Sequence, residues 1–309
     1  MHMLVFGHGY TASFLTPRLV DTGWTVTGTT RGNPGRVAAT GACPVIWPGD
    51  DDVFLHADIA RADGVLVSVA PGLKGEAGVD MAADPVLAAF GETLRSARPA
   101  WIGYLSSTNV YGDHGGGWVD ETTPPRPSTM RAQARLSAEC AWICLAGDIG
   151  CPLTIFRLAG IYGPGRGPAT KLRAGTSRRI VRDNQVFSRI HVEDITGAIM
   201  HVLQKNSLNR MDDATYPRIV NLCDDDPLPP ERAIEIAAHM LNLPVPPAEP
   251  FETAEMTRMA RSFYADSKRV RNDLLVRQLG YRLQYPDLRS GLAATITSES
   301  QTGQRIPCS

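Results

Sequence analysis

Short runs of hydrophobic residues alternate along the chain with longer segments whose hydrophobic positions recur every three or four residues. MLVFG (3–7), GVLVSVAP (64–71) and WIGYLSS (101–107) are largely apolar, and TVTGTT (25–30) is rich in β-branched residues. Such runs are typical of strands that are buried on both faces of a sheet. DPVLAAFGETLRSA (84–97) has helical spacing between two of them. The alternation predicts an α/β fold with a doubly wound parallel sheet.

The pattern changes after about residue 160. The stretch over 163–179 is rich in glycine and basic residues, and the later apolar run RIVNLC (218–223) lies between loops with many prolines and aspartates. We therefore predict a core over residues 1–160, and a mixed segment over 161–296 that completes the sheet and forms a smaller C-terminal lobe. The polar residues 297–309 are predicted to be a disordered tail.

Composition and charge restrict the partners of the protein. The 309 residues are 43% hydrophobic and carry a net charge of -1, so the chain can bury a large core and has no overall field that favours nucleic acid or an acidic membrane surface. No apolar run approaches the length of a membrane-spanning helix, and the N-terminus has no basic leader typical of an export signal. We therefore expect a cytoplasmic protein.

The six cysteines form neither a C-x-x-C pair nor a zinc-type spacing with histidine, which predicts reduced thiols and no metal site. Cys140 and Cys144 lie four residues apart on one face of a predicted helix and could together hold a metal. Packing of two small side chains against the core is the interpretation that we favour for this pair.

A glycine motif follows the first predicted strand. In FGHGYTA (6–12), Gly7, Gly9 and Ala12 match G-x-G-x-x-A between a strand and a helix, which is typical of a Rossmann-type dinucleotide-binding fold. The first glycine permits a tight turn, the second lets the backbone approach a pyrophosphate, and the helix N-terminus stabilises the phosphate charge. A glycine turn without a ligand is the alternative. Pro17, inside the expected helix, is predicted to kink it.

Further cofactor contacts are predicted where other strands end. The second strand ends in Thr30 and Arg31, where an NAD-preferring protein commonly has a carboxylate that accepts hydrogen bonds from the ribose 2'-hydroxyl. An arginine there can pair with a 2'-phosphate, so we predict NADP(H) as the preferred cofactor and NAD(H) as the second choice. The alternative is that Arg31 is a solvated surface residue. We also predict cofactor contacts for Tyr10, Thr11, Ala70, Ser106 and Leu158.

Three further segments carry a family resemblance. YLSSTNVYG (104–112), FRLAGIYGPG (156–165) and RIHVEDI (189–195) follow the glycine motif in this order. Together they resemble the extended short-chain dehydrogenase/reductase superfamily, the group that contains NAD-dependent epimerases and dehydratases, over about residues 3–292. The resemblance implies that Ser107 hydrogen-bonds a substrate oxygen beside the nicotinamide.

The chain departs from that family on the helix over STMRAQARLSAE. Arg131 and Arg135 stand where the resemblance would put the catalytic tyrosine and lysine, as in atypical subgroups that lack the Tyr-x-x-x-Lys pair. Arg135 could replace the lysine, because a guanidinium supplies both charge and hydrogen bonds to a ribose. A guanidinium that stays protonated near neutral pH is a poor general acid, so we assign Arg131 to substrate binding. The alternative is that both are border residues, solvated or paired with Glu139.

Other residues complete the predicted site. Tyr111 is a third catalytic candidate with Ser107 and Arg135, because it lies just past the strand that carries Ser107. We predict substrate contacts for Arg131, Tyr162, Arg166, Arg189 and His191, although His191 opens a helix and could instead have a packing role. The basic stretch Arg166, Lys171, Arg173, Arg178 and Arg179 favours an anionic substrate, with a solvated loop as the alternative.

Two functions remain open from the sequence. The first is an NADP(H)-binding oxidoreductase or epimerase-like enzyme with a non-standard active site, acting on a small molecule. The second is a nicotinamide-binding sensor or regulatory module without turnover. A homodimer also stays open, because the sequence does not fix the oligomeric state.

Overall fold

The structure, a computed structural model, describes residues 1–48, 52–72, 84–207 and 218–303. By its internal contacts the chain forms two compact units. The first consists of Met1–Val110, Thr129–Arg157 and Thr196–Val220, and the second of Tyr111–Ser128, Leu158–Ile195 and Asn221–Ser309. The chain therefore passes between the units several times, and Thr196–Val220, within the segment predicted both to complete the sheet and to form the smaller lobe, belongs to the first unit.

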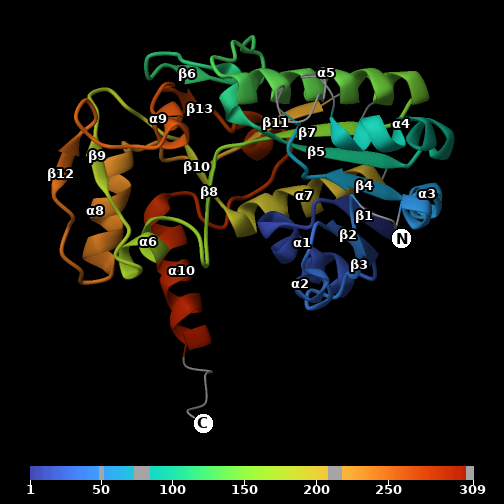
Figure 1. Cartoon of the computed structure of the whole chain (residues 1–309), viewed down its shortest axis with the longest axis horizontal. Coiled ribbons are helices and arrows are strands. Elements are labelled where there is room, and N and C mark those ends of the chain that lie inside the picture. Colours follow the sequence, from blue (N-terminus) through green and yellow to red (C-terminus); the bar gives the residue numbers. More distant parts are fainter. Residues whose placement is uncertain (49–51, 73–83, 208–217, 304–309) are drawn as a thin grey trace. The chain divides into compact units, whose positions relative to one another are not determined.

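A seven-stranded sheet organises the first unit, with strand order β11-β7-β5-β4-β1-β2-β3 (Figure 1). The paired strands from β3 to β5 are parallel. The predicted doubly wound parallel sheet is thus confirmed. The strands are β1 (His2–Phe6), β2 (Thr25–Thr30), β3 (Cys43–Ile46), β4 (Gly64–Val67), β5 (Trp101–Ser107), β7 (Leu153–Leu158) and β11 (Arg218–Leu222). The helices are α1 (Tyr10–Asp21), α2 (Pro34–Ala38), α3 (Asp52–Arg61), α4 (Pro85–Ala97), α5 (Met130–Ile149) and α7 (Val192–Ser207), and the short 3-10 helix η1 (Thr108–Tyr111) follows β5.

Apolar residues on both faces of the central strands explain why the sheet is covered on both sides. On one face, Phe6 and Val67 pack with Phe90 of α4 and Trp142 of α5, all of them buried. Helices α1 and α7 cover the other face (Figure 1). The near-continuous apolar runs in the sequence therefore correspond to strands that contact helices on either side. Helix α1 continues on both sides of Pro17.

A polar cluster lies at the amino-terminal edge of this sheet. The ring of His2 is hydrogen-bonded through Nε2 to Asp58 Oδ2 at 3.1 Å and through Nδ1 to Thr25 Oγ1 at 2.8 Å. Arg61 Nε donates to the other oxygen of Asp58 at 2.8 Å. These contacts fasten α3 to the beginnings of β1 and β2, on the edge opposite to that of the glycine motif.

Short elements form the second unit. A buried cluster joins α6, α8 and α10 through residues such as Leu172, Ala237 and Leu292. Three parallel strand pairs complete the unit, β8 with β10, β9 with β12 and β6 with β13. The strands are β6 (Trp118–Val119), β8 (Gly160–Tyr162), β9 (Arg179–Val181), β10 (Arg189–His191), β12 (Ala248–Pro250) and β13 (Arg269–Val270). The helices are α6 (Pro168–Arg173), α8 (Pro230–Met240), α9 (Arg258–Phe263), the π-helix η3 (Leu274–Gln278) and α10 (Leu288–Gly303).

The polar C-terminal segment is more ordered than its composition suggested. Residues 297–303, predicted as part of a disordered tail, belong to α10, while 304–309 lie outside the described residues. Glu299 explains the difference, because it accepts hydrogen bonds from Gly165 N at 2.8 Å and Thr170 Oγ1 at 3.0 Å and pairs with Arg173. Those contacts connect α10 to α6 and stabilise a sequence that has little intrinsic preference for burial.

The cysteines differ in part from expectation. Cys140 and Cys144 are exposed on α5, so the prediction that they pack in the core is wrong. Cys151 and Cys223 are buried, and Cys308 lies outside the described residues. Among the described residues, no group of three or more metal-ligating side chains could hold a metal ion. Nor is any described helix long and apolar enough to cross a membrane.

Candidate functional site

The glycine motif forms a tight turn between β1 and α1. Gly7 has φ +83°, and a Cβ there would approach Val69 and the backbone of Ser68 to 3.0–3.2 Å. The amide of Gly7 donates to Thr29 Oγ1 at 2.8 Å, and the following amide of His8 donates to Thr29 O at 2.7 Å. A side chain at position 7 would be both strained and crowded. The end of β2 therefore fixes the conformation of the turn.

The N-terminus of α1 offers donors to an anion. Gly9 is the N-cap, and among the described residues neither a side-chain cap nor an acidic residue satisfies the first turn. Free backbone N–H groups and the helix dipole favour a phosphate at such a position. Tyr10 is half-buried, while Thr11 and Ala12 are buried against the sheet. These residues fit a dinucleotide, because a pyrophosphate would meet backbone donors and Gly9 has no side chain of its own that could block the approach.

His8, the residue between the two glycines, was not singled out from the sequence. Its ring is 3% exposed and lies against Gly28, where a Cβ would approach His8 Cδ2 to 2.5 Å. Nε2 is within 2.8 Å of Thr16 Oγ1. Burial lowers the pKa of His8, a hydrogen bond with its own backbone opposes this effect, and the charge of Arg36 lowers the pKa further. A neutral imidazole thus fills the space beneath the turn.

Two arginines lie beyond the end of β2. Thr30 is half-buried, and Arg31 and Arg36 are exposed. Arg36 Nη2 donates to His8 O at 3.4 Å, which connects α2 to the glycine turn. Helix α2 begins after Asn33, whose side chain accepts from Arg36 N. Arg36 was missed in the sequence, although a basic residue in the first turn after the second strand is a recognisable signal for a 2'-phosphate.

Ser107 belongs to strand β5, and Arg135 of α5 contacts the same strand. Ser107 is its last residue, and its Oγ accepts the amide hydrogen of Asn109 at 3.2 Å. Arg135 Nη1 donates to Leu105 O at 2.8 Å and to Tyr104 Oη at 3.3 Å, with its guanidinium over the Tyr104 ring. Arg135 is half-buried, whereas Arg131, one turn earlier on α5, is exposed. The structure therefore distinguishes the two arginines: one is held against the strand and the other faces solvent.

A buried ion pair fixes α5 next to these residues. Glu139 and Arg157 of β7 are 1% and 2% exposed, and Arg157 Nη2 donates to Glu139 Oε2 at 2.7 Å. Ser106 Oγ donates to Glu139 Oε1, so that three elements, α5, β5 and β7, meet at one carboxylate. Glu139 therefore pairs with Arg157 and not with either arginine of the helix, contrary to the alternative weighed from the sequence. Its position one turn after Arg135 sets the register of α5 against β5.

A second buried carboxyl group, that of Asp84, interacts electrostatically with Arg135 and Tyr104. It caps α4 by accepting from Val86 N at 3.0 Å and Leu87 N at 3.2 Å. Burial raises the pKa of Asp84, while hydrogen bonding and the positive charge of Arg135 work in the opposite direction. Burial also raises the pKa of Tyr104, against the charge of Arg135. The half-buried arginine thus has a carboxyl and a phenol as electrostatic neighbours.

The remaining predicted cofactor residues lie at strand ends. Ser106 and Leu158 are buried at the ends of β5 and β7, and Ala70 is exposed three residues beyond β4. Their contact with a cofactor stays a prediction.

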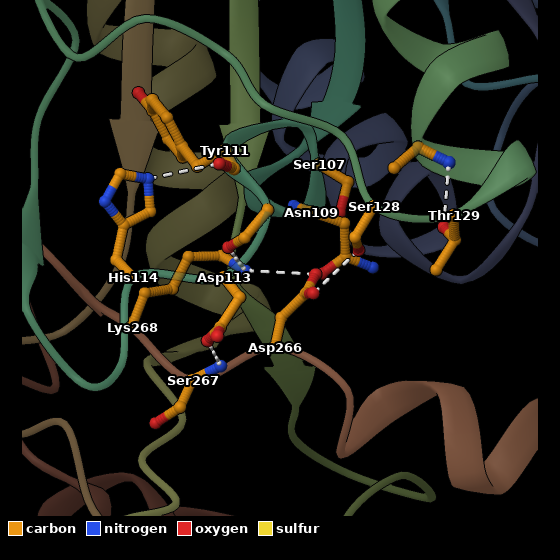
Figure 2. A network of polar contacts seen from close by, with 12 residues as sticks. Ser107, Asn109, Tyr111, Asp113, His114, Ser128, Thr129, Asp266, Ser267 and Lys268 are labelled. Atoms are coloured by element: carbon orange, nitrogen blue, oxygen red, sulfur yellow. Dashed lines mark hydrogen bonds and ion pairs between the residues drawn. The ribbon is translucent and has the colours of Figure 1, made fainter.

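Tyr111 begins the second unit and is buried. Its hydroxyl donates to Asn221 Oδ1 at 2.8 Å, so the third catalytic candidate lies in a structural contact. The segment that follows is held by a polar network within the same unit (Figure 2). Asp113 accepts from Ser267 N at 2.8 Å, and Lys268 Nζ donates to Gly112 O at 2.8 Å. This network attaches the loop after η1 to the segment that leads into β13.

Tyr162 and His191 pack together in the second unit. Their ring centroids are 5.2 Å apart, and the ring centroid of Tyr285 lies 4.3 Å from that of His191. His191 Nδ1 accepts from Glu193 N at 3.3 Å, and Nε2 is 3.2 Å from Thr295 Oγ1. Burial lowers the pKa of His191 to about 4, so the ring is neutral at physiological pH. Both ring nitrogens are used within the unit, and the predicted substrate contact of these two residues stays untested.

Most of the basic stretch is paired within the second unit. Arg173 pairs with Glu299, Arg178 with Glu249, and Arg179 with Glu235, the last at 2.8 Å. Arg166 is exposed and Arg189 is half-buried. Because three of the five charges are neutralised by carboxylates, the stretch gives less support to an anionic substrate than its sequence suggested.

A family comparison identifies the architecture. The model of the NAD dependent epimerase/dehydratase family matches residues 3–223. The chain belongs to this family. The superfamily resemblance deduced from the sequence motifs is therefore confirmed.

Individual relatives of this family member span nearly its whole length. Protein YeeZ of Escherichia coli (strain K12) is 28% identical over 291 residues, which cover 92% of this chain and 96% of YeeZ. A functionally unknown conserved protein from Silicibacter pomeroyi DSS is 44% identical, with a TM-score of 0.83 and coverage of 96% of this chain and 98% of that one. UDP-glucose-4-epimerase from Stenotrophomonas maltophila, solved with bound NAD and formylated UDP-arabinopyranose, has a TM-score of 0.75 at 19% identity, with 98% and 99% coverage. At that identity, the epimerase supports the fold alone.

Proposed function

We propose that the chain is an NADP(H)-dependent member of the epimerase/dehydratase family with a non-standard active site, an oxidoreductase or epimerase-like enzyme acting on a small molecule. The observation that carries the proposal is the arrangement at the end of β2. Thr29 accepts both amides of the glycine turn, and Arg36 reaches the same turn through His8 O at 3.4 Å. Arg36 contacts the turn and Arg31 directly follows β2, so both arginines would be available to the 2'-substituent of a dinucleotide bound at the turn.

The charge at this position favours the phosphorylated cofactor. Arg31 and Arg36 are exposed, and no carboxylate occupies the end of β2, Thr25–Thr30. A 2'-phosphate would be attracted by both guanidiniums, each of which can offer paired N–H donors. A 2'-hydroxyl would lack the carboxylate acceptor that NAD-preferring sites commonly provide. The proposed preference is accordingly for NADP(H) over NAD(H).

We assign two tasks to the chain's own residues: they orient the substrate, and they stabilise the charge that develops on it. A bound nicotinamide supplies hydride transfer. Ser107 already accepts a hydrogen bond from Asn109 N, so its hydroxyl proton can be donated to a substrate oxygen. Arg135 presents a positive charge fixed by Leu105 O, which would stabilise negative charge that develops on that oxygen. A guanidinium is a poor general acid, so in this proposal the proton comes from water or from another side chain.

The alternative is a nicotinamide-binding sensor without turnover. It is favoured by one observation, the exposure of Arg131 at the position where the family resemblance would put a tyrosine. A helix that presents no acid at this position still supports a cofactor through Arg135. The two proposals therefore share the same cofactor site and differ in proton transfer alone.

The cofactor assignment is tested by titrating the parent protein, Arg31→Ala and Arg36→Ala with NADPH and with NADH. Binding is measured through the fluorescence of the cofactor. We expect each substitution to weaken NADPH binding by roughly tenfold or more, the range for a charge-assisted contact, and to leave NADH nearly unchanged. Arg98→Ala is the matched control, because it removes an exposed arginine that precedes β5 at the opposite edge of the sheet. Equal losses for both cofactors, or a parent that prefers NADH, would contradict the NADP(H) assignment.

A further inference from the structure

Two exposed cysteines lie one helical turn apart on α5. Cys140 and Cys144 are both exposed, although free cysteine is among the most buried residue types in proteins. Residues four apart on an α-helix lie on the same face, so both thiols are on one side of α5. Ser137 and Gly147, one turn beyond the pair on either side, are exposed as well. These two positions carry no bulky side chain that could cover the thiols.

The carboxylate nearest to the pair along this face is engaged by an arginine. Asp148 is one turn beyond Cys144, where a carboxylate could complete a set of metal ligands. However, Arg95 Nη1 of α4 donates to Asp148 Oδ2 at 2.5 Å. Arg95 is also paired with Glu92, with 3.5 Å between Arg95 Nε and Glu92 Oε1. Among the described residues, no group of three or more ligating side chains could hold a metal ion. The ligands that this surface offers are therefore two sulfur atoms.

The spacing of the pair favours an interposed metal ion over a direct disulfide. The Cβ atoms of helical residues four apart are about 5–6 Å from each other. A disulfide needs a Cβ···Cβ distance of about 3.5–4.5 Å, so forming one between Cys140 and Cys144 would distort α5. A metal ion with two thiolate bonds of roughly 2.3 Å separates its sulfur atoms by up to about 4.6 Å, which rotation about χ1 can supply. Two histidines at the same helical spacing chelate zinc in the H-E-x-x-H motif, so the spacing itself is suited to chelation.

Two sulfur ligands without a third donor select a soft ion. Structural zinc takes four protein ligands, and Mg²⁺ and Ca²⁺ take oxygen ligands, so neither class is satisfied by two thiolates. Thiolates favour Cu(I), which is stable with two sulfur ligands in a nearly linear arrangement. The donor set of Cys140 and Cys144 therefore fits Cu(I) better than it fits the harder divalent ions.

We propose that Cys140 and Cys144 form a two-coordinate binding site for Cu(I) on the exposed face of α5. When the ion binds, each thiol releases its proton to solvent and each sulfur forms one bond to copper. One Cu(I) and two thiols thus give a bis-thiolate complex with a single negative charge and two free protons, and no electron is transferred. The site uses neither the nicotinamide cofactor nor a substrate, so it is independent of the proposed function.

The test is a competition for Cu(I) between the full chain and the coloured chelator bicinchoninate, in anaerobic solution with ascorbate as the reductant. Every sample carries Cys308→Ser, so that a thiol outside the described residues contributes no ligand. We expect the parent to withdraw one Cu(I) per chain from the chelator. Cys140→Ser and Cys144→Ser should each weaken Cu(I) binding by at least roughly a hundredfold, because the second sulfur of a chelate binds intramolecularly. Both thiols are exposed, so the serine variants should keep the fold, which circular dichroism checks.

The matched control is Cys43→Ser, which removes an exposed thiol from β3 and should bind Cu(I) like the parent. The proposal is overturned if the parent withdraws no Cu(I), or if Cys43→Ser loses as much binding as the α5 variants. It is also overturned if Cys140→Ser and Cys144→Ser each keep about half of the bound copper, because the two thiols would then act separately. Zn(II) binding as tight as that of Cu(I) would show that further ligands are present. A Cu(I)-dependent change in elution volume on size exclusion would show that the ion joins two chains, and either result would contradict a two-coordinate site within one helix.

Discussion

The ion pair between Glu139 and Arg157 is the contact whose loss should change the protein most. Both side chains are almost completely buried, and the carboxylate also accepts from Ser106. Glu139→Gln keeps the shape of the side chain and removes its charge. Arg157 would then be a buried cation that faces a neutral amide in place of the Glu139 carboxylate.

The burial of both side chains determines the expected loss in the free energy of unfolding. Removing one partner of a buried ion pair typically costs about 3–5 kcal/mol, whereas an exposed pair contributes at most about 1 kcal/mol. The chain offers the comparison, because Glu92 pairs with Arg95 at 3.5 Å while Glu92 is 94% exposed. Glu92→Gln should therefore be nearly neutral. The double change Glu139→Leu with Arg157→Met should recover much of the lost stability, since it removes both buried charges.

Urea unfolding followed by tryptophan fluorescence measures this difference. Four of the five tryptophans lie in the first unit, so the signal reports mainly on the sheet and its helices. A loss below about 1 kcal/mol in Glu139→Gln would refute the reasoning, because the pair would then behave like a surface contact. A double variant as unstable as the single one would show that packing volume, and not charge, is what Glu139 contributes.

Two further predictions concern the arginines of helix α5 and the stability of the folded protein in acid. Arg135→Ala should weaken the binding of NADPH and of NADH alike, roughly tenfold, because the proposed contact of Arg135 would not involve the 2'-phosphate. Arg131 is exposed, so Arg131→Ala should leave the binding of both cofactors unchanged. A fluorescence titration in which Arg135→Ala binds both cofactors like the parent would contradict this role. Burial would raise the pKa of Asp58, but hydrogen bonds from His2 and other donors outweigh it and lower the pKa. The stability that Asp58 contributes should therefore be present above about pH 5 and be lost as the pH falls below about 4. Urea unfolding of Asp58→Asn should differ from the parent at pH 7 and converge with it in acid, while exposed Asp21→Asn should match the parent throughout.

The sheet could be predicted because its signals are local. Apolar runs of four to seven residues correspond to β1, β4 and β5, and the glycine motif specifies the turn after β1 through backbone requirements that few other residues meet. Gly7 illustrates this, since its positive φ and the nearby Val69 both exclude a side chain. Residues that act through the backbone of their own segment are readable from sequence.

The polar interior could not be predicted, because its partners are distant in the chain. Ser106 and Glu139 are separated by 33 residues, and Tyr111 and Asn221 by 110. Each residue alone is compatible with a solvated surface, and only the fold brings the pairs together. The same reason explains the basic stretch, whose charge is neutralised by carboxylates such as Glu299, which is 126 residues beyond Arg173. Net local charge in a sequence is therefore a weak guide to the charge that a ligand meets.

One part of helix α5 has a purely structural role. Catalysis would depend on another part, the turn that carries Arg131 and Arg135. Glu139 and Trp142 are buried and fix the helix against the sheet, so its position is independent of what stands at 131 and 135. Arg135 uses only Nη1 for Leu105 O and Tyr104, and a guanidinium has further N–H donors with which to bind a ribose hydroxyl. An arginine can thus take over the binding work of a lysine without taking over proton transfer. If the protein turns over a substrate, the pH dependence of that reaction must belong to a group outside this helix turn. If it does not, the proposed cofactor site is unaffected, because none of the residues assigned to it depends on the missing acid.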